Sequence, residues 1–204
     1  TKIPVKLVSN TTSTMNDINE MWRNHAPLYV SAALEQSAGR GRYGHTWTAP
    51  PGCCLMLTYP YQSNSNCSDK YAFTAALAVH DFIKQFSKLS CTFLWPNDVV
   101  VGTKKLAGIL IEQPLPKCFS IGIGINIKHM EWPDDIASRA ISIEDLTDIP
   151  DTGMFSLCQQ LVCLLEARLS WAESVSLKQV ILAWKVFSST TGTKYHGIDS
   201  KVVT

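Results

Sequence analysis

The stretch GRGRYGHTW at 39–47 is the first segment whose residue types could do chemistry. Glycines let a backbone bend tightly and bring its N–H groups close to an anion. Arg40 and Arg42 add fixed charge and bidentate geometry for a phosphate or a carboxylate, and Trp47 offers a flat face for stacking an aromatic base. A solvated arginine–glycine loop or an RNA-binding loop would contain the same residue types. The single copy and the net charge of +1 count against RNA.

A second set of polar residues follows at WPND (95–98) and KKLAGI (104–109). An Asn-Asp turn after a strand is common, so WPND alone does not indicate a functional site. A lysine that enters a buried strand is costly unless its charge is matched, and an anionic ligand would match Lys105. Asp98 could hold this lysine or a magnesium-bound phosphate. Lys104 is the expected solvated lysine at the turn.

The string GIGIN at 122–126 superficially resembles a dinucleotide fingerprint. It fails that test, because it has no third glycine and a strand-like run continues through Ile127 where a helix should begin. Glycines that alternate with isoleucines leave one face of a strand bare, so a ligand or a neighbouring backbone can approach. Asn126 at the strand end could bind a polar group. Simple packing is the alternative explanation.

Together these motifs resemble, in order and spacing, the biotin–protein ligase family, also called biotin acetyl-CoA-carboxylase ligase or holocarboxylase synthetase. The family pattern is roughly GRGRxGRxW, KWPND, K[LI]AG[IV]L[VI]E and G[IV]GIN, and the resemblance runs from Ser13 to about Trp184. It implies an enzyme that makes biotinyl-5′-AMP from biotin and ATP with Mg²⁺. The biotin would then be transferred to a lysine on the biotin carboxyl carrier domain of a carboxylase.

The resemblance also implies roles for single residues. Lys105 would contact the biotin carboxylate and the α-phosphate. The expected catalytic residues are Lys105, Arg42, Arg40 and Asp98. The expected biotin-binding residues are Ser13, Thr14, Gln36, Gly39, Arg40, Arg42, Lys105, Gly108, Leu110 and Gly122. The expected ATP- and adenylate-binding residues are Trp47, Asn97, Lys105, Gly124 and Asn126. No residue is assigned as a metal ligand.

Two departures from the family pattern each remove a cation from the expected phosphate region. Leu94 stands where the family has a lysine before WPND, and His45 stands where it has a third loop arginine. These departures leave open a catalytically weakened biotin-binding protein as an alternative. A lipoate–protein ligase is a further alternative, although the RRxSGGGxVxHD string typical of that family is absent.

The elements that must position these residues mix strands and helices. Apolar runs predict strands at 5–8, 28–34, 54–61, 93–101, 106–112 and 119–127. Helical periodicity predicts helices at 14–24, 71–86, 155–172 and 177–187. Hairpin-length links late in the sheet favour an α+β fold over a doubly wound parallel sheet. The resemblance implies a mixed, largely antiparallel sheet flanked by helices, as in biotin/lipoate ligases and class II synthetases.

The composition of the chain indicates its structural class, its compartment and its kinds of partner. The 204 residues are 46% hydrophobic and 17% charged, which is typical of a globular protein. Seven cysteines without a CxxC pair disfavour a disulfide framework and a zinc site. The first residues printed do not form the apolar h-region of a signal peptide, and no apolar run is near the roughly 20 residues that cross a bilayer. We therefore expect a cytoplasmic protein with no nucleic-acid or membrane partner.

One catalytic domain is expected over 1–190. Members of the family that the chain resembles usually carry a small C-terminal β-domain, and the segment 191–204 would be its start, either in a trimmed or minimal form or with the remainder missing from this sequence. Nothing before the first strand resembles a winged helix, so a repressor function is not expected. Whether the protein forms a homodimer stays open.

Overall fold

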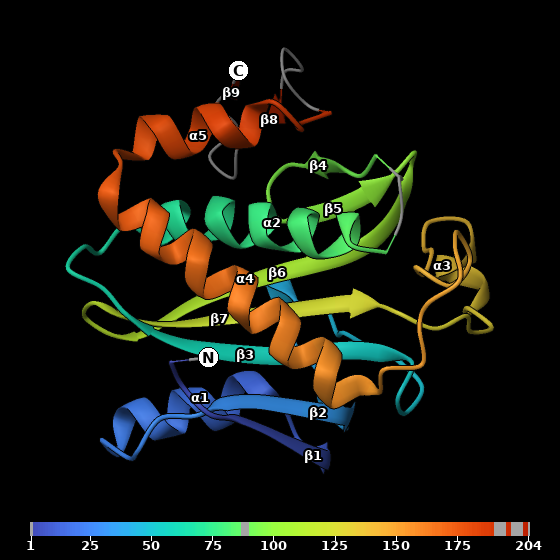
Figure 1. The fold of residues 1–204 in the computed structure, drawn as a ribbon, viewed down its shortest axis with the longest axis horizontal. Coiled ribbons are helices and arrows are strands. Elements are labelled where there is room, and N and C mark those ends of the chain that lie inside the picture. The colour runs from blue at the N-terminus through green and yellow to red at the C-terminus, as the bar shows by residue number, and fades with distance from the viewer. Residues whose placement is uncertain (1, 87–89, 190–194, 197–201, 204) are drawn as a thin grey trace.

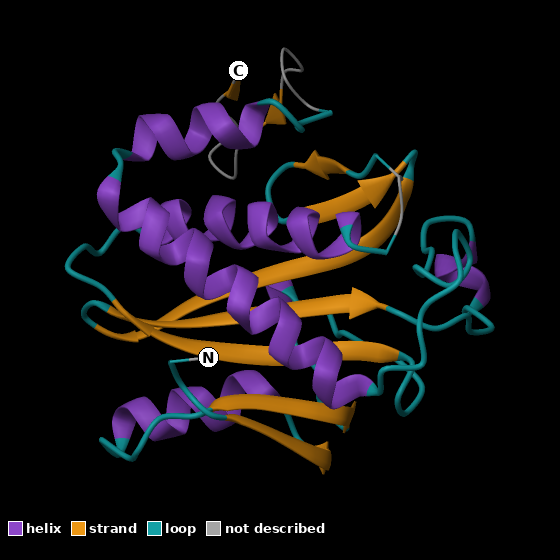
Figure 2. Ribbon diagram, in the orientation of Figure 1, coloured by secondary structure: helices purple, strands orange, loops and turns teal. Residues whose placement is uncertain are grey.

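A seven-stranded mixed sheet is the centre of the fold in the computed structural model, which describes residues 2–86, 90–189, 195–196 and 202–203 (Figures 1 and 2). Its strands run in the order β1 (Val5–Thr11), β2 (Val30–Gln36), β3 (Cys54–Gln62), β7 (Cys118–Asn126), β6 (Lys104–Leu115), β5 (Asp98–Val101) and β4 (Thr92–Leu94). Only β1 and β2 pair in parallel among these strands. The expected α+β fold with a largely antiparallel sheet is therefore confirmed.

Helices cover both faces of this sheet. The described helices are α1 (Thr14–Arg23), α2 (Ser68–Lys84), α3 (Asp134–Ala137), α4 (Met154–Ser174) and α5 (Leu177–Lys185), with a 3₁₀ turn at Arg42–Gly44. Figure 1 shows α2 and α4 crossing one face, with α5 beyond α2. None of the helices in the described ranges is long and apolar enough to cross a membrane.

The alternation along β7 separates the two faces of the sheet. Ile121, Ile123 and Ile125 are buried in the large core that includes residues of α2 and α4. The residues between them face the other way, where the Cε methyl group of Met15 on α1 lies against Gly122. Because successive strand residues point to opposite faces, the glycines of GIGIN are bare on the α1 side. A ligand could approach the sheet on that side.

The expected single strand at 93–101 is wrong, since β4 and β5 form a hairpin with WPND between them. Leu94 pairs with Asp98, and the Trp95–Pro96 peptide is cis. A proline has no N–H to donate to a ladder, so this run could not continue as a central strand. The hairpin turns Asn97 and Asp98 toward β6.

The chain after β7 had no sequence assignment between 128 and 153. It contains α3, and its residue Ala140 forms a parallel bridge with Lys105. The expected start of a C-terminal β-domain at 191–204 lies outside the described residues, apart from two short strands. These are β8 (Tyr195–His196) and β9 (Val202–Val203), which pair antiparallel. The expected domain division stays a prediction.

Acidification should destabilise the fold partly through His80 on α2. Its side chain is buried against Phe187, with ring centroids 4.0 Å apart, and its Nδ1 lies 3.6 Å from Asp81 Oδ1. Burial, followed by the charge of Lys84, lowers the pKa of His80 below its usual 6.5, while Asp81 opposes this shift. Between that lowered pKa and 6.5 the unfolded chain binds more protons at this histidine than the folded chain does. The contribution of neutral His80 to the free energy of unfolding is therefore fully present above pH 6.5 and is lost as the pH falls through this window.

We expect His80→Phe to lose less stability than the parent between pH 7.5 and pH 5.5. Urea unfolding midpoints at the two pH values measure this difference. Arg168 donates to Asp81 through hydrogen bonds of 2.6 and 2.9 Å that do not involve His80, so His80→Phe leaves this pair in place. An equal loss in the parent and the variant would remove His80 as a source of the acid sensitivity.

Candidate active site

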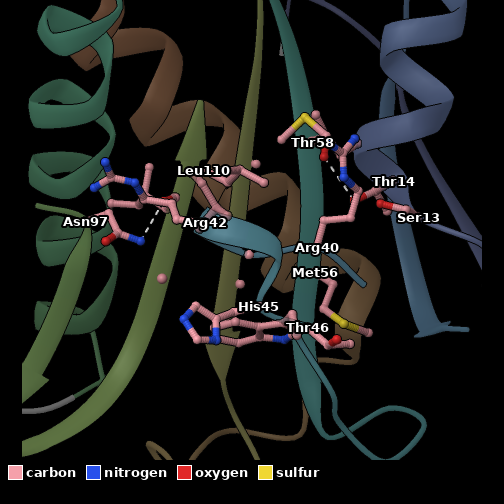
Figure 3. Close-up of a pocket in the computed structure, with 18 of the residues that line it drawn as sticks. Ser13, Thr14, Arg40, Arg42, His45, Thr46, Met56, Thr58, Asn97 and Leu110 are labelled. Atoms are coloured by element: carbon pink, nitrogen blue, oxygen red, sulfur yellow. Dashed lines mark hydrogen bonds between the residues drawn. The ribbon is translucent and has the colours of Figure 1, made fainter. Parts of the chain in front are cut away.

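A cavity of about 240 Å³ lies on the α1 side of the sheet, between the 39–47 loop and strands β3, β6 and β7 (Figure 3). Thirteen of the fifteen residues expected in the site line this cavity. They are Ser13, Thr14, Gln36, Arg40, Arg42, Trp47, Asn97, Asp98, Lys105, Gly108, Leu110, Gly122 and Gly124. Segments separated by more than a hundred residues therefore meet in one place. Arg42 and Lys105 share this cavity rather than lying on opposite sides of the molecule.

The end of the cavity near α1 is polar. Gln36 Oε1 accepts hydrogen bonds from the backbone N–H and the hydroxyl of Thr14, at 2.8 and 3.2 Å. The Thr14 hydroxyl also lies 2.9 Å from that of Thr58. Ser13 is the N-cap residue of α1, yet its hydroxyl makes no capping bond and is buried without a hydrogen-bond partner in the described structure. A buried hydroxyl without a partner costs about 1–3 kcal/mol, so this end suits a polar ligand group.

Thr58 is a lining residue that the sequence reasoning missed. The only available signal was a single threonine inside the largely apolar run of β3, CLMLTYPY. Its partner in β7 is Gly122, so the two residues face the cavity side by side.

Trp47 lies on a shelf made by two glycines. Gly108 of β6 and Gly124 of β7 are direct partners in the sheet. A Cβ added to Gly124 would lie 2.7 Å from the Trp47 indole, and one added to Gly108 would lie 2.9 Å from it. Both distances are shorter than real Cβ contacts, so only glycines allow the indole to lie this close to the sheet.

Lys105 forms the charged end of the cavity. Its Nζ lies 2.7 Å from Asp98 Oδ1 and 5.5 Å from the centre of the Trp47 ring. The charge of Lys105 is therefore matched by a carboxylate of the protein, as one of the two sequence interpretations proposed. Its side chain stays 37% exposed, so its ammonium can still reach a ligand.

Asn97 and Asn126 line cavities, but their amides also bind the protein. Asn97 Nδ2 donates to the carbonyl of Ile109 at 3.1 Å, which ties the WPND turn to β6. Asn126 Nδ2 donates to the carbonyls of Lys105 and Ile141, at 3.3 and 3.0 Å. Its Oδ1 accepts from the thiol of Cys54, which burial keeps protonated by raising its pKa to about 12. Asn126 thus fixes the backbone that carries Lys105.

The loop over the cavity is a small hairpin. Trp47 donates its N–H to the carbonyl of Gly39 at 3.0 Å, and Gly41 donates to the carbonyl of His45 at 2.7 Å. Gly39 is buried at the base of the hairpin rather than in the cavity wall. Figure 3 shows the two loop arginines diverging, with Arg40 toward Thr14 and Arg42 toward Asn97. Arg42 also donates to the hydroxyl of Tyr43 at 3.0 Å.

A second cavity of about 720 Å³ adjoins the first. The two share His45, Thr46, Trp47, Asp98 and Lys105 as lining residues. The second cavity extends to Leu94, Asn126, Trp132, Arg139 and Ala140, among others. Both positions that depart from the family pattern, 45 and 94, therefore line this second cavity. Its wall at 132–140 gave no motif that sequence reasoning could use.

The described residues contain no group of three or more histidine, cysteine, aspartate or glutamate side chains placed to hold a metal ion. Asp98 is the carboxylate that lines both cavities. A magnesium ion that enters with a nucleotide needs only one or two protein carboxylates, because phosphates and waters supply its other ligands. This site fits that kind of magnesium binding better than a dedicated metal centre.

Comparison with known proteins gives a family match and a fold match. The model of the biotin/lipoate A/B protein ligase family matches residues 6–126. The chain is 26% identical over 192 residues to the bifunctional ligase/repressor BirA of Bacillus subtilis, a match that covers 89% of this chain and 58% of that protein. It is 31% identical over 176 residues to the biotin–[acetyl-CoA-carboxylase] ligase of Mycobacterium tuberculosis, covering 80% of this chain and 63% of that one. The chain therefore spans about three fifths of the length of these curated relatives.

Solved structures share the fold at lower identity. The biotin protein ligase of Aquifex aeolicus in complex with biotin and ATP superposes with a TM-score of 0.81 at 20% identity, over 94% of this chain and 81% of that one. The biotin protein ligase of Leishmania major in complex with biotinyl-5-AMP superposes with a TM-score of 0.77 at 20% identity, over 96% and 85%. At this identity the match establishes the fold.

Proposed function

Because the chain belongs to the biotin/lipoate A/B protein ligase family, we propose that it is an ATP-dependent biotin–protein ligase. It would form biotinyl-5′-AMP and transfer biotin to a lysine on the carrier domain of a carboxylase, in the cytoplasm. The observation that carries this proposal is one cavity with a polar end at Ser13, Thr14 and Gln36, a glycine-lined middle and Lys105 at the other end. That sequence of surfaces matches biotin, which has a ureido ring, an aliphatic tail and a carboxylate.

The ureido group would bind at Ser13, Thr14 and Gln36. A ureido group has two N–H donors and one carbonyl acceptor, so it needs acceptors and donors at the same end. The unpartnered hydroxyl of Ser13 can serve as either a donor or an acceptor. The tail would lie along Leu110 and Gly122, on the face of the sheet that the glycine leaves bare. This placement directs the carboxylate toward Lys105.

In the first half-reaction, a carboxylate oxygen of biotin attacks the α-phosphorus of ATP. The bond from that phosphorus to the α–β bridging oxygen breaks, and pyrophosphate leaves. Two anions must approach each other, so fixed cations lower the barrier electrostatically. Lys105 and Arg42 would supply that charge, and Trp47 would pack against the adenine between the two cavities. Asp98 would help to hold a magnesium ion that neutralises phosphate charge.

In the second half-reaction, the lysine amine of the carrier domain attacks the carbonyl carbon of the mixed anhydride. An amide forms as the bond from the carbonyl carbon to the phosphate oxygen breaks, AMP leaves with that electron pair, and the amine releases a proton to water. The anhydride is reactive toward water, so the 39–47 loop would protect it by covering the cavity.

Incubation with labelled biotin, ATP and a biotin carboxyl carrier domain tests the proposal. We expect pyrophosphate release that depends on biotin, followed by label on the carrier lysine. Lipoate in place of biotin should give neither product. Biotin binding without pyrophosphate release would show a biotin-binding protein rather than an enzyme. Turnover of lipoate would show that lipoate, not biotin, is the substrate.

The position of Leu94 supports a prediction about ATP use. Its side chain is 39% exposed and lines the second cavity together with Lys105. Leu94→Lys adds a cation to the cavity that Lys105 lines, and Lys105 is proposed to contact the α-phosphate. We therefore expect the KM for ATP to fall about two- to fivefold, the effect of one exposed charge pair. Initial rates against ATP concentration measure this change. Val186→Lys, which adds a lysine at another exposed apolar position, is the control. An unchanged or higher KM for ATP in Leu94→Lys would contradict the placement of the phosphates.

A further inference from the structure

We infer that Glu112 is a positioning residue that fastens the 39–47 loop over the cavity by holding Arg40. The part of this inference that concerns catalysis rests on the proposed function. The fastening itself rests only on the contacts of the two side chains.

The pairing of Arg40 with Glu112 is bidentate. Arg40 Nη2 lies 2.5 Å from Glu112 Oε1, and Nη1 lies 3.1 Å from Glu112 Oε2. The same Nη1 also donates to Asn16 Oδ1 on α1, at 2.9 Å. Two parallel N–H···O bonds fix the direction as well as the distance of a guanidinium. This explains why Arg40 extends to the α1 side instead of toward Lys105.

Glu112 is itself held in place by the body of the protein. Asn19 Nδ2 on α1 donates to Glu112 Oε2 at 2.6 Å. The Oδ1 of Asn19 in turn accepts from the hydroxyl of Ser120 at 2.7 Å, and Ser120 is the β7 partner of Glu112 in the sheet. Asn19 and Ser120 are buried. One half of the ion pair is thus immobilised in advance, which reduces the entropy lost when Arg40 docks.

The loop has few other attachments. Within the described structure, the side-chain hydrogen bonds from 40–46 to residues outside the loop are those of Arg40. The bonds of Gly41 and Trp47 close the hairpin on itself. Apart from the packing of Trp47 on its glycine shelf, the ion pair is what joins the loop to α1 and β6.

Two readouts test the fastening, and the first needs no enzyme activity. Trypsin cuts after arginine, so cleavage after Arg40 or Arg42 in the native protein reports how often the loop opens. Glu112→Gln keeps the side-chain volume but loses the negative charge, and we expect about fivefold faster cleavage, near the upper value for a partly exposed ion pair. Glu20→Gln removes a carboxylate from the exposed face of α1 and should behave as the parent.

The second readout follows the reactive intermediate. With biotin and ATP but no carrier domain, we expect Glu112→Gln to release more biotinyl-5′-AMP than the parent, measured as label on lysines of an added bystander protein. The rate of the first pyrophosphate release should change less than this leakage, whereas general damage to the fold would lower both. Thermal midpoints of the three proteins check that each is folded.

The outcomes separate this inference from the proposed function. If the parent makes no biotinyl-5′-AMP, the proposed function is wrong. The trypsin comparison still tests whether Glu112 holds the loop closed. If the parent is active but Glu112→Gln matches Glu20→Gln in cleavage, the fastening by Glu112 is wrong whatever the leakage. Faster cleavage with unchanged leakage would keep the fastening and overturn its role in retaining the intermediate.

Discussion

Lys105→Ala is expected to lower the rate of biotin-dependent pyrophosphate release by at least about 10²–10³-fold, the cost of losing one preorganised charge contact to a transition state. Lys105 lines both cavities, and its ammonium lies 5.5 Å from the centre of the Trp47 ring. Water in its place would not give the same stabilisation, because water must reorient as charge develops and a fixed charge need not. Single-turnover measurement of the first pyrophosphate released isolates this step from product release.

The neighbour Lys104 is the matched control. It is part of β6 but does not line either cavity. Lys104→Ala removes the same number of atoms and the same charge one residue away, so we expect activity near that of the parent. Equal losses in both variants would mean that the effect is general electrostatics and not a contact at the reacting atoms.

Asp98 complicates the interpretation of Lys105→Ala, and a double variant resolves the complication. Removing the lysine leaves the carboxylate of Asp98 without the partner that lies 2.7 Å away. An unpaired carboxylate would repel phosphate, so part of the loss could come from Asp98. Lys105→Ala combined with Asp98→Asn removes that repulsion, and Asp98→Asn alone measures the separate cost of losing the carboxylate proposed to hold magnesium. If the double variant recovered the parent rate, the contact role assigned to Lys105 would be wrong.

Most of the elements, and the bare strand face in the site, follow from local patterns. Alternation in GIGIN predicted a strand with one bare face, and the register of β6 on β7 then pairs Gly108 with Gly124 under Trp47. Strand alternation is a local property, so it can be read from the sequence. The expectation that the four motifs meet in one cavity came from the family resemblance instead. No local pattern could have given that arrangement.

Three features of the site had no such signal. WPND forms a hairpin between β4 and β5. The residues on both sides of it are apolar, so the sequence looked like one continuous strand. The pairing of Arg40 with Glu112 joins residues 72 positions apart, and both had other plausible partners. The wall of the second cavity at 132–140 consists of a loop and one helical turn, whose path depends on tertiary contacts with Lys105.

Gly39→Ala is the second substitution from which we expect a large effect. A Cβ at this position would lie 2.2 Å from the carbonyl oxygen of Trp47. That oxygen belongs to the backbone, so no side-chain rotation can relieve the clash. The base of the hairpin, closed by the 3.0 Å hydrogen bond from Trp47 to Gly39, must therefore separate. We expect a higher KM for biotin and slower pyrophosphate release, because the loop would no longer cover the cavity.

The size of this effect follows from the cost of overpacking, about 1–3 kcal/mol, which corresponds to a roughly fivefold to hundredfold loss of the closed loop. Gly41→Ala in the same hairpin is the graded control, since its Cβ would lie 3.1 Å from the carbonyl oxygen of His45 and needs only a small adjustment. Biotin titrations of pyrophosphate release, with thermal midpoints to confirm folding, should rank the parent above Gly41→Ala and Gly41→Ala above Gly39→Ala. If Gly39→Ala bound biotin as the parent does, the closed hairpin at 39–47 would not be the form of the loop that holds biotin.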